Sequence, residues 1–410
     1  MDHKIAIKLS SKKGRSNSIE FDIKGDSNVG LDKSIINAIR RTLLSSIPCV
    51  SFRTDMDQSD IIMEKNNTSL HNEFLLHRVA LLPLYINPIE YNKQYLFYLN
   101  VENVDQPVKT ITAGDFQIFP LKKNIDPDLI KSIDKNNYDL GNPIPDKEKN
   151  AILRPFKFKN KNSYCILTEL KNNNSTVKQD LELYGVPRVS FGYENARWQS
   201  VSCAAYSFKK NNDLFKKVLE EKIITEKVEN KKEFEKELFI SESERYFYRD
   251  NSAEPFWYDF KIDSIHHNSS KDLFIMAIDI ITKNLEILSK EFSKLTTDED
   301  SIMHLEKDRS NDNIYSINVH NNDDTIGNII QSHISRYLID NDSVLNMCGY
   351  TKVHPLKDNI IFNLSINPNN KIFNADIDQK IVSFIQVFQE ACSDLTYIYS
   401  KIKDEAENKL

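Results

Sequence analysis

Two long amphipathic helices with one shared spacing of apolar residues constrain the fold of this chain most. Residues 271–295 carry apolar side chains at alternating intervals of four and three, from Phe274 to Leu295. Residues 376–403 show the same alternation from Ile377 to Ile402. One such stripe needs an apolar partner, and two matched stripes can supply each other. The spacing therefore predicts that the two helices pack together.

A short motif also occurs twice. Residues 34–39 and 325–330 share the pattern Ser/Thr-Ile-x-Asn-x-Ile, and each copy opens a helix that follows an alternating, strand-like segment. A coincidence between two amphipathic helices is the alternative interpretation. The repeat predicts an α+β fold with two related units packed as an intramolecular pseudo-two-fold pair. The strands expected around the two motif copies are 4–9 and 19–23, with a turn around 12–14, then 315–319 and 359–366.

Three polar stretches separate the patterned segments. Residues 121–162 are rich in turn formers and are expected to be loop. Residues 209–245 are dense in Lys and Glu, which favours a solvated helical insertion. Residues 296–312 are acidic and polar, which is typical of a linker.

Composition excludes several classes of function. Only 9 of 410 residues are Gly, and neither GxxxxGK followed by Ser or Thr nor GxGxxG occurs, which argues against nucleotide-binding folds. The net charge of −6 argues against nucleic-acid binding as the main activity. Five dispersed cysteines without a CxxC pair exclude a zinc ribbon and indicate a reducing compartment. The first residues hold no apolar stretch, so we expect no signal peptide, and no apolar run is long enough for a membrane span.

No constellation of catalytic residues is apparent. The His71-Asn72-Glu73 triplet lacks the cysteine partners of a zinc deaminase, and His71 and His77 fall on different faces of a helix. We therefore expect no catalytic residue in this chain.

Longer blocks of sequence resemble a known family. Residues 31–48, 71–84 and 194–206 are similar to the assembly subunits of multisubunit RNA polymerases, namely the third-largest eukaryotic subunit, its archaeal D-type counterpart and the amino-terminal domain of bacterial alpha. Residues 324–328 and 349–355 resemble the small eleventh subunit, or its archaeal L-type counterpart. These resemblances cover most of the chain, but only poorly at 121–162 and 209–250.

The resemblance implies a division of the chain. Residues 1–50 and 200–295 would form a third-subunit-like dimerisation domain, interrupted by an inserted, mainly-β domain at 51–199. Residues 313–410 would form an eleventh-subunit-like dimerisation domain behind the linker at 296–312. Such a fusion of two cellular subunits is associated with large cytoplasmic DNA viruses. The expected location is therefore the viral factory in the cytoplasm and the virion, or the nucleus if the source is cellular.

The resemblance also implies a function and partners. The chain would be a non-catalytic platform that docks the second-largest and largest polymerase subunits, with a small tenth-subunit-like chain as a further candidate. We expect no membrane contact, little nucleic-acid contact and no cofactor. The arginines among the partner-binding candidates have an alternative interpretation, in which they are simply solvated on a polar helix face. The partner-binding candidates are Lys33, Asn37, Arg40, Arg41, His77, Arg78 and Arg197. The candidates for the intramolecular dimer interface are Leu31, Ile35, Ile39, Ile278, Leu285, Phe292, Ile326, Gly327, Ile330, Phe384, Phe388 and Leu395.

One departure from the family pattern matters. Many relatives bind zinc through cysteines that follow the block at 71–84, but residues 81–100 contain none, so we expect no metal. The second interpretation of the whole chain is a free nucleic-acid-binding transcription regulator, for which the basic stretch Lys8–Arg15 is weak support.

Overall fold

The chain forms two compact units in this computed structural model. Residues 8–410 are described, except 16, 56–57, 93–94, 122–140, 160, 173–178, 228–229, 299–300, 302, 309–312 and 358. Unit 1 comprises Met1–Leu43, Cys203–Asp263 and Ser270–Leu410, and unit 2 comprises Leu44–Ser202 and Ser264–Ser269. Both units contain helices and sheets, so the predicted α+β class is confirmed.

Unit 1 contains two halves with the same order of elements. Each half pairs its four strands in the same spatial order, β1-β2-β14-β13 in the first and β15-β16-β18-β17 in the second. The elements of the first half are β1 (Lys8–Arg15), β2 (Ser18–Lys24), α1 (Lys33–Ser45), β13 (Val201–Phe208), β14 (Trp257–Ser264) and α6 (Ser270–Phe292). The elements of the second half are β15 (Met303–Lys307), β16 (Ile314–His320), α7 (Asp324–His333), β17 (Leu345–Thr351), β18 (Asn359–Ile366) and α8 (Ile377–Lys409).

Each half packs its long helix on its own sheet through aromatic side chains. In the first half, the Phe21 ring of β2 meets the Phe274 ring of α6 edge-on at 5.1 Å between centroids. In the second half, the Phe362 ring of β18 meets the Phe388 ring of α8 at 5.0 Å. All four rings are fully buried. Alternating strand residues therefore face the helix stripe, as the apolar patterns predict.

The prediction that residues 296–312 form only a linker was wrong, because part of this segment is a strand. Residues 303–307 form β15, which pairs with β16 and is the counterpart of β1. Met303 and Leu305 are buried, at 1% and 4% exposure. Only five residues make up this edge strand, and acidic and polar neighbours on both sides conceal its short alternation.

The first hairpin also differs from the expectation. Strand β1 continues through residues 12–14, where we expected the turn, and reaches Arg15 opposite Ser18. The pairing register shifts between Ser11 and Lys13, so the strand absorbs an irregularity there. Residues 4–7 of the expected strand lie outside the described residues.

The charged segment at 209–245 contains a helical hairpin, as expected. Helices α4 (Asn212–Thr225) and α5 (Lys231–Glu242) share a small core of Phe215, Leu219 and Leu238. The hairpin is inserted between β13 and β14. The corresponding connection in the second half, between β17 and β18, holds no helix among its described residues.

Unit 2 is built around the sheet β4-β11-β5-β7. Within the expected loop at 121–162, the chain forms a short helix and a two-stranded hairpin, while residues 122–140 lie outside the described part. The elements of the unit are β3 (Pro48–Ser51), β4 (Ile61–Asn66), α2 (Asn72–Ala80), β5 (Tyr95–Glu102), β6 (Val108–Thr112), β7 (Gln117–Pro120), α3 (Asp146–Ile152), β8 (Phe156–Phe158), β9 (Lys161–Ser163), β10 (Ile166–Lys171), β11 (Asp180–Gly185) and β12 (Arg188–Phe191).

Candidate assembly surface

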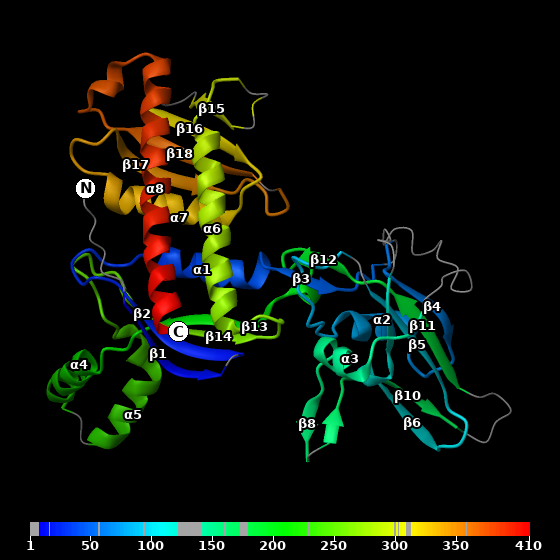
Figure 1. Ribbon diagram of the computed structural model, residues 1–410. Helices are drawn as coiled ribbons and strands as arrows, with labels where there is room; N and C mark the ends of the chain where they lie inside the picture. The colour runs from blue at the N-terminus through cyan, green and yellow to red at the C-terminus, as the bar shows by residue number, and fades with distance from the viewer. Residues whose placement is uncertain are drawn as a thin grey trace. The chain divides into compact units, whose positions relative to one another are not determined.

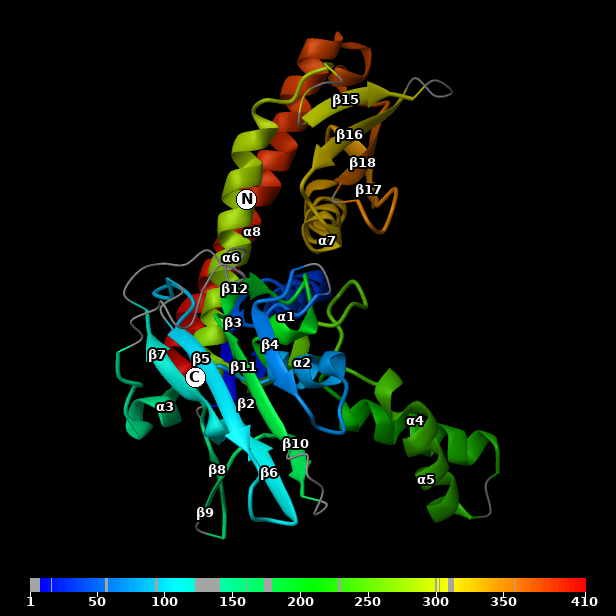
Figure 2. The ribbon, with the colours of Figure 1, turned by 90° about the vertical axis from the view of Figure 1, so that its right-hand side faces the viewer.

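Helices α6 and α8 pack antiparallel, side by side in both ribbon views (Figures 1 and 2). Lys271 at the start of α6 donates its Nζ to the carbonyl oxygen of Glu407 near the end of α8, at 2.8 Å. At the opposite end, the Phe292 ring stacks on the Phe388 ring at 4.4 Å between centroids. The interface candidates on these helices are each at most 1% exposed: Ile278, Leu285, Phe292, Phe384, Phe388 and Leu395.

Two polar contacts across the α6–α8 pair join corresponding positions with the partners exchanged. When the two apolar stripes are superimposed, Asp279 falls on Gln389 and Ser293 falls on Lys403. Asp279 pairs with Lys403 at 2.6 Å, and Gln389 donates to the Ser293 hydroxyl at 2.8 Å. In a two-fold interface every contact recurs with the two partners exchanged. These two contacts are such a pair, so the helices follow a pseudo-two-fold arrangement.

Helices α1 and α7 show the same doubling. When the repeated motif is superimposed, Asp32 falls on Asp323 and Arg41 falls on Ser332. The Asp32 carboxylate accepts a hydrogen bond from the Ser332 hydroxyl. The Asp323 carboxylate pairs with the Arg41 guanidinium at 3.5 Å, and Arg41 also donates to the Thr325 hydroxyl at 2.9 Å. Each half therefore offers its Asp to the corresponding position of the other half.

The same two carboxylates cap the helices. Asp32 accepts from the backbone N–H of Ser34 at 2.8 Å, and Asp323 accepts from the backbone N–H of Thr325 at 2.9 Å. A carboxylate before the first turn satisfies a backbone donor that has no partner inside the helix. Neither Asp was among the predicted interface residues, although both motif copies carry an Asp two positions before the Ser or Thr.

Further hydrogen bonds join the two halves. Tyr399 of α8, which is fully buried, donates its hydroxyl to the carbonyl oxygen of Ile35 in α1 at 3.3 Å. Burial raises the pKa of Tyr399, which keeps the phenol protonated and able to donate. Arg336 forms an ion pair with Asp250 of the first half. Leu31, which precedes α1, and the interface candidates on α1 and α7 are at most 5% exposed: Ile35, Ile39, Ile326 and Ile330.

Gly327 has a different role from the one predicted. A Cβ atom at this position would lie 2.8 Å from Cδ2 of Tyr350, in β17 of the same half. The glycine therefore allows α7 to approach its own sheet. Its absent side chain explains why a residue that costs about 1 kcal/mol relative to Ala is found inside this helix.

The polar face of α1 carries four of the partner-binding candidates. Lys33 pairs with Glu254 at 3.0 Å, and both side chains are about half exposed. Arg40 donates its Nε to the Asn37 side chain at 2.9 Å. Arg41 faces the second half, as described above, and keeps 37% of its side chain exposed. The structure thus places Lys33, Asn37 and Arg40 on an accessible face, and gives Arg41 an intramolecular partner.

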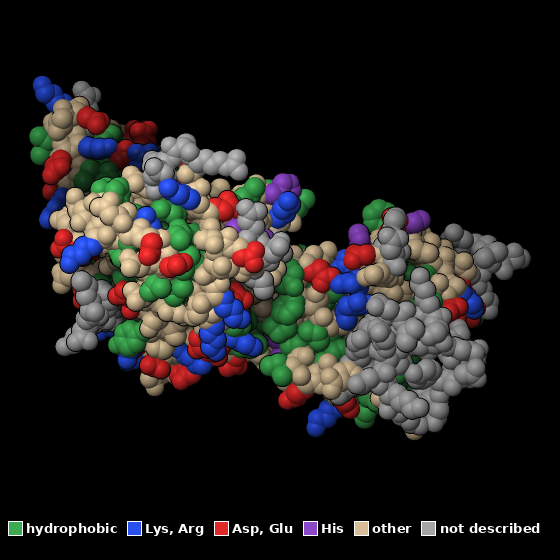
Figure 3. Space-filling model, turned by 90° about the horizontal axis from the view of Figure 1, so that it is seen from above, with side chains coloured by type: hydrophobic (Ala, Val, Ile, Leu, Met, Phe, Trp, Pro, Cys, Tyr) green, Lys and Arg blue, Asp and Glu red, His purple; other side chains and the backbone are tan. Residues whose placement is uncertain are grey.

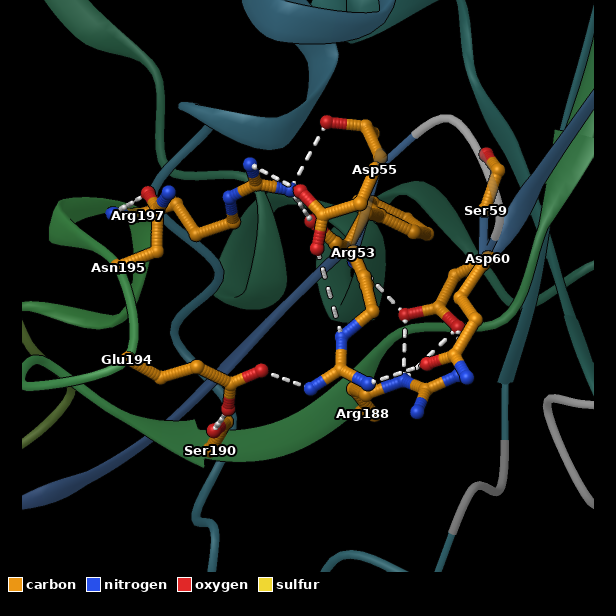
Figure 4. Close-up of polar contacts among 12 residues, drawn as sticks. Arg53, Asp55, Ser59, Asp60, Arg188, Ser190, Glu194, Asn195 and Arg197 are labelled. Carbon is orange, nitrogen blue, oxygen red and sulfur yellow. Dashed lines mark hydrogen bonds and ion pairs between the residues drawn. The ribbon is translucent and has the colours of Figure 1, made fainter.

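Arg197 lies inside a polar network of unit 2 (Figure 4). Only 7% of its side chain is exposed. Its guanidinium donates to the carbonyl oxygen of Phe52 at 3.3 Å and to the Thr54 hydroxyl at 2.8 Å, and pairs with Asp55 at 3.3 Å. These bonds fix the segment that returns from unit 2, so the contacts of Arg197 are structural in this chain.

Asp60 anchors the second part of this network. It is fully buried, and the Arg188 Nε donates to both of its carboxylate oxygens at 2.9 Å. The backbone N–H of Arg53 adds a third bond at 2.7 Å. Burial raises the pKa of Asp60, although the bonds from Arg188 and Arg53 oppose this shift. Asp60 and Arg188 are 128 positions apart, and no motif in the sequence links them.

His77 and Arg78 lie near the end of α2, and both are exposed. Arg78 donates to the carbonyl oxygen of Leu167 in β10 at 2.6 Å, which ties the helix to that strand. The Arg78 cation in the last turn also interacts favourably with the negative end of the helix dipole.

A cavity of about 260 Å³ lies beside this helix end in unit 2. Its lining includes Cys49, Leu82, Pro83, Arg197 and His266. His266 is only 4% exposed, and burial, followed by the neighbouring His267, lowers its pKa to about 4. The cavity therefore contains a neutral imidazole at physiological pH.

Neither a metal centre nor a membrane-spanning helix is found among the described residues. No three His, Cys, Asp or Glu side chains within the described ranges converge as metal ligands would. In the same part of the chain, no helix has the length and hydropathy needed to cross a bilayer.

Comparison with known proteins places the chain in a family. The family model of the RNA polymerase Rpb3/Rpb11 dimerisation domain matches residues 27–285. The human protein "DNA-directed RNA polymerases I and III subunit RPAC1" is 37% identical over 81 residues, which is 19% of this chain and 20% of that protein. The Dictyostelium discoideum protein "DNA-directed RNA polymerases I and III subunit rpac1" is 35% identical over 103 residues, a quarter of each chain. The match thus spans a quarter or less of these relatives' lengths. The family match covers more than half of the sequence, and the chain belongs to the RNA polymerase Rpb3/Rpb11 dimerisation domain family.

Proposed function

We propose that this chain is a non-catalytic assembly subunit of a DNA-directed RNA polymerase, in which two dimerisation partners form a single polypeptide. The observation that carries this proposal is the doubling of contacts inside unit 1. Asp32 with Ser332 and Asp323 with Arg41 are corresponding contacts between two halves that share one strand order. The names of the relatives, which describe subunits of DNA-directed RNA polymerases, support the same role.

The proposal that the second half is an eleventh-subunit-like partner does not rest on the family match. The family match ends at residue 285, before this half begins. The support is the shared strand order together with the resemblance of 349–355 to that subunit. Covalent linkage would make pairing of the halves a folding step, because a short connection holds them at an effective concentration on the order of millimolar.

Light scattering tests the intramolecular pairing. We expect the purified chain to be a monomer at every concentration. A stable homodimer would mean that the halves pair between two chains, and it would contradict the proposed arrangement.

The polar face of α1 is proposed to dock the second-largest and largest polymerase subunits, with a tenth-subunit-like chain as a further partner. Ion pairs between exposed side chains contribute about 0–1 kcal/mol, so Lys33 can exchange Glu254 for a carboxylate of a partner at little cost. Arg40 adds a planar guanidinium that suits bidentate contacts to carboxylates. Arg78, with the exposed His77 beside it, offers a second basic site on unit 2.

Copurification of the polymerase with tagged variants tests this surface. Arg40→Glu should abolish recovery of the large subunits, because it places a negative charge where a carboxylate would dock. Arg41 is left unchanged, since its reversal would also repel Asp323. Lys283→Glu, an exposed position on α6, is the matched control and should recover all subunits. Full recovery with Arg40→Glu would refute docking through α1.

A viral origin and a cytoplasmic location are proposed from the fusion alone. The association of joined partner subunits with large cytoplasmic DNA viruses supports them. Immunofluorescence of the chain in infected cells is the corresponding test, and purely nuclear staining would contradict it.

A further inference from the structure

The hairpin β8–β9 in unit 2 exposes aromatic side chains to solvent. Phe156 and Phe158 are 58% and 60% exposed. Phe belongs among the residues that folded proteins usually bury, so two such rings on one short ribbon are informative. Figure 2 shows the hairpin extending away from the larger sheet of its unit.

The pairing register assigns these rings to one face of the ribbon. Phe156 lies opposite Ser163, and Phe158 lies opposite Lys161. Side chains two positions apart in a strand point to the same face, at a spacing of about 6.5 Å. That face therefore carries two aromatic rings in a row with a lysine beside them.

The charge of the segment has one sign. Residues 151–168 contain Arg154, Lys157, Lys159 and Lys161 and no Asp or Glu, whereas the whole chain has a net charge of −6. On the face of the molecule drawn in Figure 3, by contrast, Lys and Arg are interspersed with Asp and Glu. The hairpin is thus locally basic, although the net negative charge of the whole chain predicted little nucleic-acid contact.

A cation and a ring already lie together at two points. The Lys159 Nζ is 5.5 Å from the centre of the Phe158 ring. At the base of the hairpin, the Arg154 guanidinium lies 4.1 Å from the centre of the Tyr85 ring. Rings and guanidinium planes beside free cations are the combination that binds successive unpaired bases and their phosphates.

We propose that the β8–β9 hairpin binds single-stranded nucleic acid, with Phe156 and Phe158 stacking on neighbouring bases and Lys159 and Lys161 contacting phosphates. This inference does not depend on the proposed assembly function. An acidic polypeptide would satisfy the lysines, but it would leave two exposed rings without a matching surface. The aromatic pair therefore favours a nucleic acid.

Fluorescence anisotropy of the full chain with labelled oligothymidylate and oligouridylate tests the proposal. Phe156→Ala and Phe158→Ala should each weaken binding about tenfold, as expected for loss of one stacked base. Two phosphate contacts predict a slope of about −1.4 for the logarithm of affinity against that of salt concentration, and Lys161→Gln should reduce its magnitude by about 0.7. Phe74→Ala removes an equally exposed ring from α2 of the same unit and should leave the affinity unchanged.

Several results would overturn the proposal. Affinity that is insensitive to both Phe substitutions would exclude stacking. Equal binding of a blunt duplex would show attraction to phosphates alone. Competition by polyglutamate at matched charge, lost in the same variants, would identify an acidic protein segment as the ligand. Circular dichroism spectra that match the parent chain confirm that each variant is folded.

Discussion

Removing the Asp32 carboxylate should destabilise unit 1 more than removing its counterpart, Asp323. The two residues occupy corresponding positions, and each caps its own helix and contacts the other half. They differ in burial. Asp32 is 4% exposed, whereas 46% of the Asp323 side chain and 37% of its partner Arg41 are exposed.

The difference can be estimated from these contacts. Loss of a capping side chain costs about 1 kcal/mol at either position. The buried bond between Ser332 and the Asp32 carboxylate adds about 2 kcal/mol, as expected for a hydrogen bond to a charged group. The exposed pair of Asp323 and Arg41 adds less than about 1 kcal/mol. We therefore expect Asp32→Ala to cost about 3 kcal/mol and Asp323→Ala about 1.5 kcal/mol.

Urea unfolding followed by tryptophan fluorescence measures the difference. The chain has two tryptophans, Trp198 in unit 2 and Trp257 in unit 1, so a Trp198→Phe background leaves a reporter for unit 1 alone. Asp32→Asn, which keeps an oxygen for capping but loses the charge, should fall between the parent and Asp32→Ala. If Asp323→Ala costs as much as Asp32→Ala, burial does not distinguish the two contacts and the reasoning is wrong.

Three further perturbations address other parts of the fold. Leu285→Ala at the fully buried α6–α8 interface should cost about 3 kcal/mol in urea unfolding, while Ile287→Ala, at a position 46% exposed, should cost less than about 1 kcal/mol. Gly192→Ala would press a Cβ into the backbone oxygen of Leu44 and should lower the free energy of unfolding by about 2 kcal/mol or more, whereas Gly349→Ala meets nothing within 4 Å and should be nearly neutral by the same measurement. Folding lowers the pKa of His266 to about 4, so between about pH 7 and about pH 5 His266 binds a proton in the unfolded chain but stays neutral in the folded chain. The free energy of unfolding should therefore fall by about 2 kcal/mol over this pH range. His266→Asn keeps an acceptor for the local turn and should remove this part of the pH dependence, and an unchanged pH profile would contradict the assignment.

The long helices and their pairing were predictable from the sequence because apolar periodicity records directly which face of a helix is buried. Phe274 and Phe384 belong to two stripes of equal spacing, and both are fully buried. Strand β15 was not predictable in the same way. Five residues give too little alternation to stand out from an acidic neighbourhood, and their partner strand β16 decides their conformation.

The candidate surface could be predicted only in part for a related reason. Sequence shows that Arg41 and Arg197 are cations in polar positions, but the available partners are set by distant segments. Arg41 meets Asp323, which is nearly three hundred positions away, and Arg197 is enclosed by Thr54 and Asp55. By contrast, each motif copy is preceded by an Asp two positions before its Ser or Thr. Aligning the two copies with a few more residues on the amino-terminal side would reveal this shared Asp from the sequence alone.

The positions of the two insertions explain how the first half acquired additional parts without losing its pairing with the second half. Unit 2 is inserted between α1 and β13, and the α4–α5 hairpin between β13 and β14. The contacts of α1 with α7 and of α6 with α8 lie outside both insertions, and the β13–β14 connection adds the ion pair of Asp250 with Arg336. The base of the α4–α5 insertion is closed by a hydrogen bond from the Asn211 N–H to the Tyr246 carbonyl oxygen at 2.8 Å, so the flanking strands remain in register. Because the pseudo-two-fold contacts lie on the helices and the insertions lie in the connections, new binding surfaces such as the β8–β9 hairpin can be added to one half while those contacts are retained.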